Sequence, residues 1–160
     1  AAGIAACADQ ARDLAAEVLI ASDLSRARLA GEAIGLATDV PLSIDPRWRE
    51  LDFGAWDGMA PGDVEGAALA RFWDDPDGHA PPGGERWSAL VERVSAAIDD
   101  LAARPTLIVT HAGAMRAALA VLCGFDMHQT WAVDLPYNCL LTLRVWPGAT
   151  PTAQIAGLYP

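Results

Sequence analysis

One stretch of the sequence, residues 106–121, joins the pattern of a buried strand to that of a helix through a single histidine. Residues 107–109 form a short, uninterrupted apolar run, which predicts a strand buried on both faces. A helix rich in alanine and leucine is expected over residues 114–123. His111 lies between them, at the carboxyl end of the expected strand, where open α/β sheets bind their ligands. The stretch therefore predicts an α/β fold, in which His111 either contacts an anion or packs in the turn.

The rest of the chain alternates between the two periodicities and predicts one domain over residues 1–160. Helices are expected over residues 8–17, 22–35, 63–73 and 85–103, and strands over 18–21, 42–44, 139–146 and 154–158. This order predicts a three-layer α/β/α architecture with a mostly parallel mixed sheet. Ser22 is expected to cap the second helix. The abrupt junction after Glu17 suggests missing residues there, because such connections usually take several residues.

Charge and cysteine content narrow the classes of function. The formal net charge of −10 argues against nucleic acids and anionic membranes as partners. An anion site must then be built locally, from a few arginines and backbone amides. The three cysteines form no Cys-x-x-Cys pair, no run is long enough to cross a bilayer, and residues 1–7 lack a basic leader. We therefore expect a cytoplasmic protein.

Two further residues are candidates for the chemistry of an anion site. Arg26 lies in the first turn of an expected helix, where its guanidinium and the helix N-terminus could serve one anion, or where it could simply face solvent. Glu50 lies in an irregular loop over residues 47–58. It could form a surface ion pair with a neighbouring arginine, or be desolvated enough to hold a proton near neutral pH. His79 and His128 have no ligand spacing around them.

Four motifs occur in this order along the chain: Ser22-Asp23-Leu24-Ser25-Arg26-Ala27, Arg49-Glu50-Leu51-Asp52-Phe53-Gly54-Ala55-Trp56-Asp57-Gly58, Pro82-Gly83-Gly84-Glu85 and Val109-Thr110-His111-Ala112-Gly113. Together they resemble the histidine phosphatase superfamily, also called phosphoglycerate mutase-like. Residues 72–76 and 81–85 look most like the α-ribazole phosphatase branch of cobalamin synthesis. The resemblance covers most of the chain.

The resemblance implies a two-step phosphoryl transfer through a phosphohistidine, with no metal or other cofactor. A histidine on the first strand of the family, in an Arg-His-Gly motif, attacks phosphorus. His111 matches the second histidine, which contacts the phosphoryl oxygens, and Arg26 matches the phosphate-binding arginine. Glu50 matches the general acid that protonates the leaving oxygen and then activates water. The implied substrate is a small phosphorylated metabolite, with α-ribazole 5′-phosphate as the specific expectation.

The sequence departs from the family at one point, because no Arg-His pair occurs among its 160 residues. The first strand of the family is central, and its omission would leave buried strand edges unpaired. We therefore expect the native protein to have an N-terminal segment that this sequence lacks. Two alternatives stay open: a phosphoglycerate mutase-type phosphotransferase, and a non-catalytic anion-binding relative without the nucleophile. A homodimer also stays open, because exposed tryptophans can mark an interface.

Overall fold

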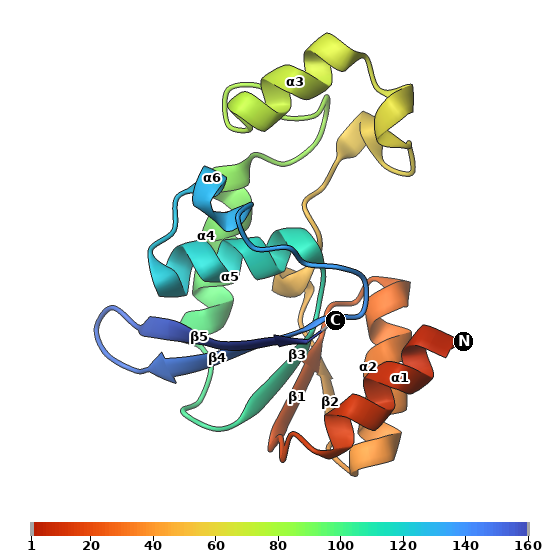
Figure 1. Cartoon of the computed structure of the whole chain (residues 1–160), viewed down its shortest axis with the longest axis vertical. Coiled ribbons are helices and arrows are strands. Elements are labelled where there is room, and N and C mark those ends of the chain that lie inside the picture. The colour runs from red at the N-terminus through yellow and green to blue at the C-terminus, as the bar shows by residue number, and fades with distance from the viewer. Residues whose placement is uncertain (1, 160) are drawn as a thin grey trace.

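Three parallel strands lie at the centre of the structure, a computed structural model that describes residues 2–159 (Figure 1). Strand β1 (Val18–Ala21) lies between β2 (Leu42–Ile44) and β3 (Thr106–Val109). Both pairings are parallel, and Leu19 of β1 is opposite Leu42 and Leu107. The expected α/β fold with a parallel sheet is confirmed. Ala1 and Pro160, the ends of the expected domain, lie outside the described residues.

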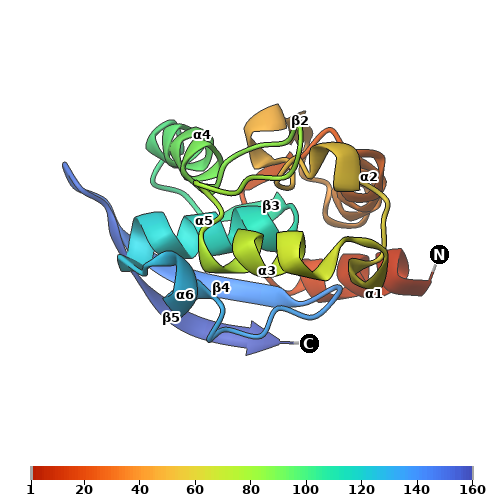
Figure 2. The ribbon, with the colours of Figure 1, turned by 90° about the horizontal axis from the view of Figure 1, so that it is seen from above.

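Helices cover both faces of this sheet (Figures 1 and 2). Helices α1 (Ala2–Arg12) and α2 (Ser25–Thr38) pack on one face, and α4 (Trp87–Asp99) and α5 (Ala112–Cys123) on the other. Side chains alternate between the faces of a strand, so Leu107 contacts the first helix pair and Ile108 the second. Leu90 and Leu119 are completely buried. The apolar faces of α4 and α5 therefore form part of the core.

The chain between β2 and α4 contains an insertion, defined here as residues 54–84. It begins with two short 3-10 turns (Gly54–Trp56 and Pro61–Asp63), continues into α3 (Gly66–Asp74) and stands away from the sheet (Figure 1). Trp73 of α3 packs edge-on against Trp131, which follows the short helix α6 (Met127–Thr130), with ring centres 4.7 Å apart. The insertion therefore contacts the segment that follows α5.

A C-terminal hairpin completes the described chain. Strands β4 (Leu140–Trp146) and β5 (Thr152–Tyr159) form an antiparallel ladder of their own, with an irregularity after Thr142. Within residues 2–159, β3 has a strand partner on one edge only. Helix pairs pack on both faces of residues 107–109, as expected, but all four residues of β3 are only half-buried. A strand with one open edge is shielded less completely than a central strand.

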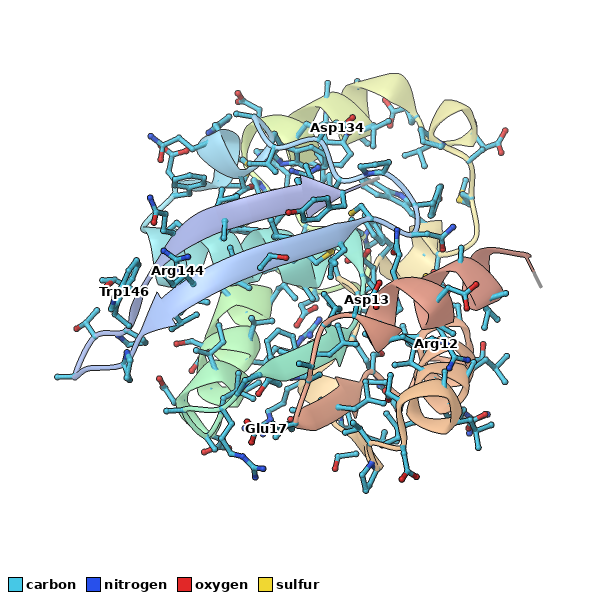
Figure 3. The ribbon with its side chains drawn as sticks, turned by 60° about the horizontal axis from the view of Figure 1, so that its bottom comes forward. Arg12, Asp13, Glu17, Asp134, Arg144 and Trp146 are labelled. Atoms are coloured by element: carbon cyan, nitrogen blue, oxygen red, sulfur yellow. The ribbon has the colours of Figure 1, made fainter. Side chains whose placement is uncertain are left out.

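Three expectations about helix ends are wrong. The first helix ends at Arg12, so five residues lead to β1 and the junction after Glu17 is not abrupt (Figure 3). The amide of Glu17 donates to the carbonyl of Pro105 across 2.8 Å, which docks this connection beside β3. The second helix begins at Ser25, after an extended Leu24, so Ser22 does not cap it. Helix α4 is shorter than expected at both ends: residues 85–86 belong to the turn that closes the insertion, and Asp100 is the C-cap.

Candidate active site

The carboxyl ends of β1 and β3 bring Ser22 and His111 together. Ser22 directly follows β1, and His111 lies two residues beyond the end of β3. The amide of Ser22 donates to the carbonyl of Val109 across 3.0 Å. The Nε2 atom of His111 lies 3.0 Å from the Ser22 hydroxyl, and the Nε–H of Arg26 donates to His111 Nδ1 across 3.1 Å. Arg26 lies in the first turn of α2, which starts just after Ser22. The parallel pairing of β1 and β3 therefore assembles three polar side chains that are distant in sequence.

These contacts define the protonation state of His111. Arginine can only donate, so Nδ1 of His111 must accept and carries no proton. The proton of the neutral ring then lies on Nε2 and is donated to Ser22. Burial, reinforced by the positive charges of Arg26 and Arg93, lowers the pKa of His111 to about 4. Near neutral pH His111 is therefore an uncharged hydrogen-bond donor.

Arg26 keeps most of its hydrogen-bonding capacity available. Only its Nε–H is used within residues 2–159, which leaves both terminal nitrogens for a ligand. The neighbouring Arg28 instead faces Glu32 at 3.7 Å on the exposed side of α2. The planar guanidinium of Arg26 can present parallel N–H groups to two phosphate oxygens. The two arginines of this helix therefore differ in what they can bind.

Glu50 reaches the site from the loop after β2. Its carboxylate accepts the amide of Leu51 across 2.9 Å and lies against Gly113, in the first turn of α5. A Cβ added to Gly113 would lie 2.0 Å from Glu50 Oε1, so only glycine permits this approach. Burial raises the pKa of Glu50, while the Leu51 and Gly113 amides, Arg26 and Arg93 oppose the rise.

Glu50 forms no ion pair with a neighbouring arginine among residues 2–159, so the expected alternative of a surface ion pair is wrong. Arg47 pairs instead with Asp45 and Asp100, and Arg49 pairs with Asp23. A desolvated carboxyl group with a raised pKa is what a general acid requires near neutral pH.

Sequence reasoning missed two members of this arrangement. Ser22 was expected to cap a helix but holds the imidazole of His111. Arg93, on α4, was hidden among the polar residues of an amphipathic helix and binds the loop that carries Glu50. No motif marks Arg93, although Glu85, its ion-pair partner, belongs to the Pro-Gly-Gly-Glu motif.

The remaining histidines stay outside the site. His79 lies in the insertion, 3.9 Å from Asp75, and His128 is exposed on α6. Among residues 2–159, no cluster of histidine, cysteine, aspartate or glutamate side chains could hold a metal ion. No helix in the same range is long and apolar enough to span a membrane.

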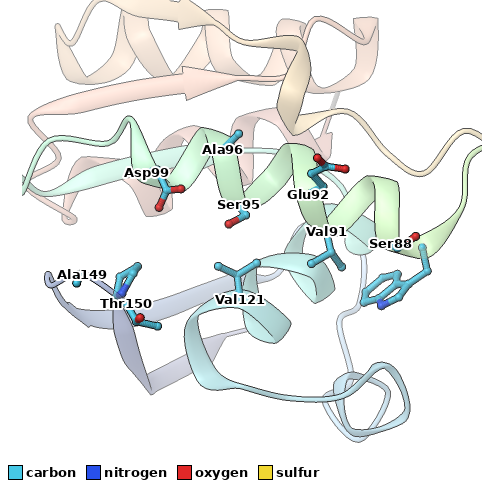
Figure 4. A pocket seen from close by; sticks show the side chains of 11 residues that line it. Ser88, Val91, Glu92, Ser95, Ala96, Asp99, Val121, Ala149 and Thr150 are labelled. Atoms are coloured by element: carbon cyan, nitrogen blue, oxygen red, sulfur yellow. The ribbon is translucent and has the colours of Figure 1, made fainter.

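A separate groove runs between α4, α5 and the turn of the C-terminal hairpin (Figure 4). Glu92 and Asp99 line it, and its lining contains no arginine, lysine or histidine. Because these acidic side chains would repel a phosphate, the groove is a poor site for the anion that Arg26 can bind.

Comparison with known proteins identifies the family. The model of the histidine phosphatase superfamily (branch 1) matches residues 2–155. The chain belongs to this superfamily. It is 33% identical over 129 residues to a glucosyl-3-phosphoglycerate phosphatase of Mycolicibacterium vanbaalenii, a match that covers 72% of this chain and 57% of that protein. It is 26% identical to an adenosylcobalamin/α-ribazole phosphatase of Salmonella typhimurium, covering 81% of this chain and 68% of the relative.

Solved structures of similar proteins have the same fold as this chain. A mycobacterial glucosyl-3-phosphoglycerate phosphatase superposes with a TM-score of 0.84 at 24% identity, covering 98% of this chain and 82% of that one. The match of the family model to residues 2–155 confirms, at the level of the superfamily, the resemblance inferred from the four motifs. The match to the first curated relative spans only 57% of its length.

Proposed function

We propose that the full-length protein is a phosphomonoester hydrolase that works through a phosphohistidine and needs no metal. The main observation in support of the proposal is that Arg26, His111 and Glu50 lie together at the N-terminus of α5. A guanidinium, a neutral N–H donor and helix amides stabilise the charge of a phosphoryl group. This local arrangement can hold an anion although the chain has a net charge of −10.

The nucleophile is proposed to come from a strand outside residues 2–159 that pairs with the open edge of β3. Such a strand would end beside His111, because parallel neighbours end at the same edge of a sheet. The open edge of β3 supports this proposal, since strand edges in a folded core are normally paired or covered. The residues that precede Ala1 in the reading frame of the gene would test it.

The reaction then follows in two balanced steps. In the first, a nitrogen–phosphorus bond forms at the nucleophilic histidine while the ester phosphorus–oxygen bond breaks, and the proton of the Glu50 carboxyl group goes to the leaving oxygen. In the second, water attacks phosphorus, its proton returns to Glu50, and the nitrogen–phosphorus bond breaks to release inorganic phosphate. Arg26 binds the non-bridging oxygens throughout, and the Nε2–H of His111 binds one of them by exchanging its contact with Ser22 for the phosphoryl group.

Two phosphorylated metabolites are candidate substrates. α-Ribazole 5′-phosphate is the first candidate, supported by the segments over residues 72–76 and 81–85 and by the named activity of the Salmonella relative. Glucosyl-3-phosphoglycerate is the second, supported by the higher identity to the Mycolicibacterium relative. A ratio of kcat/KM above about 100 for one of them, equivalent to about 2.7 kcal/mol, would identify the preferred substrate.

The decisive experiment measures hydrolysis of p-nitrophenyl phosphate by the full-length protein in EDTA. We expect turnover to persist in the chelator and His111→Ala to lower kcat/KM by about 100-fold or more, as for other lost transition-state donors. Mass spectrometry of the acid-labile adduct should reveal a phosphohistidine. Unchanged turnover in His111→Ala would refute the assignment, and transfer of the phosphate to a second hydroxyl group would identify a mutase.

A further inference from the structure

Arg93 of α4 is the centre of a dense set of hydrogen bonds. Its Nη1 atom donates to the carbonyls of Arg47 and Arg49 across 2.7 and 2.9 Å. Its Nη2 atom donates to the carbonyl of Glu50 across 2.9 Å. One side chain therefore holds the backbone of the loop immediately before and at Glu50.

Glu85 completes the set from the other side. Its two carboxylate oxygens accept from Nε and Nη2 of Arg93 across 2.7 and 2.8 Å. The two side chains are only 22% and 17% exposed, so solvent screens this bidentate pair weakly. All five N–H groups of Arg93 are thus used within the protein, whereas Arg26 uses one. Arg93 has no donor left for a phosphate.

The same glutamate closes the base of the insertion. The amide of Glu85 donates to the carbonyl of Asp52 across 2.8 Å, and the amide of Asp52 donates back to the Glu85 carboxylate across 3.3 Å. A Cβ on Gly84 would lie 2.5 Å from the Asp52 carbonyl oxygen, so the two ends of the insertion touch through their backbones. Glu50 is two residues from this closure. The position of its backbone is therefore set by Arg93 and by the closed base together.

We propose that the Glu85–Arg93 pair is a positioning device that holds the carboxyl group of Glu50 against the N-terminus of α5. The inference rests on the proposed role of Glu50 as general acid. Arg93 and Glu85 are positioning residues, because neither has a free group to offer the substrate. Loss of the pair lets the loop relax, and small displacements of a proton donor cost much of its catalytic effect.

The test compares four single variants and one double variant of the full-length protein, using aryl and alkyl phosphates whose leaving groups differ in pKa. Arg93→Lys keeps the charge but loses the planar fork, and Glu85→Gln keeps the shape but loses the charge. Glu50→Gln is the reference for loss of the acid. Asp100→Asn is the matched control, because it removes an exposed partner of Arg47 on the same loop without touching Glu50.

We expect Arg93→Lys and Glu85→Gln to lower kcat about 10-fold for alkyl phosphates, with less effect on p-nitrophenyl phosphate and on KM. Glu50→Gln should show the same trend more strongly, and the double variant Arg93→Lys/Glu50→Gln should lose no more than Glu50→Gln alone. Asp100→Asn should behave as wild type.

Three results would overturn the inference. The first is an equal loss for good and poor leaving groups in both Arg93→Lys and Glu85→Gln. The second is a loss in the double variant that adds to that of Glu50→Gln. The third is wild-type kinetics in a folded Arg93→Lys. If the loss of activity in Glu50→Gln does not depend on the leaving group, the proposed role of Glu50 as general acid is wrong. That result differs from the three above, which contradict only the positioning role of Arg93 and Glu85.

Discussion

The Nε–H of Arg26 donates to Nδ1 of His111, and this contact places the single proton of the imidazole on Nε2. Because burial lowers the pKa of His111 to about 4, the ring should stay neutral through the physiological range. Nitrogen chemical shifts of the labelled imidazole should therefore report the Nε2–H tautomer from pH 8 down to about pH 5. Titration near the ordinary histidine pKa of about 6.5 would contradict the geometry.

The lowered pKa also predicts how stability depends on pH. Below about pH 6.5 the unfolded chain protonates His111 while the folded chain does not, so stability falls as pH drops toward 4. The loss is about 3 kcal/mol at pH 4 and reaches its limit only at lower pH, where the folded chain is protonated as well. Urea unfolding at pH 7 and pH 4 should show this extra loss in the wild type relative to His111→Asn. An identical pH dependence in both proteins would show that His111 titrates normally in the folded state.

Gly113 should be essential for the placement of Glu50. A Cβ there would meet Glu50 Oε1 at 2.0 Å, so Gly113→Ala must displace the carboxyl group. We expect kcat to fall about 10- to 100-fold, or about 1.4–2.7 kcal/mol in activation free energy. Gly66→Ala is the control, because a Cβ at this first residue of α3 meets nothing within 4 Å. Wild-type activity in Gly113→Ala would place Glu50 outside the reaction.

The raised pKa of Glu50 predicts the alkaline limb of the pH profile. A general acid must hold its proton, so kcat for alkyl phosphates should fall as pH rises through this pKa. Arg26, Arg93 and Arg116 act on Glu50 electrostatically, and neutral His111 adds no charge. Measuring kcat from pH 5 to 9 for wild type and Glu50→Gln checks this, and an unchanged limb in the variant would assign it to another group.

The sequence predicted the elements that depend on local patterns. The apolar run at residues 107–109 and the alanine-rich helix after it correspond to β3 and α5, because strand and helix periodicities are local properties. The junction at Glu17 was misjudged for a different reason. Residues 2–12 are helical although few of them are strongly apolar, and their packing on α2 decides where α1 lies.

The candidate site could be predicted only where a motif marks it. Arg26, Glu50 and His111 came from motifs, but their meeting point depends on the order of the parallel strands. Arg93 escaped prediction because its role lies in binding backbone carbonyls of a loop more than 40 residues away. Carbonyl groups carry no sequence signal, so such contacts become visible only in three dimensions.

A phosphate titration of the ¹⁵N-labelled full-length protein tests most directly whether Arg26 and His111 form a phosphate site. Inorganic phosphate should shift the Arg26 Nε–H and His111 Nε2–H resonances with one saturation curve. Arg26→Lys, which loses the planar fork, should weaken binding at least about 10-fold, or about 1.4 kcal/mol. Phosphate binding that leaves both resonances unmoved, or that Arg26→Lys does not weaken, would contradict the account.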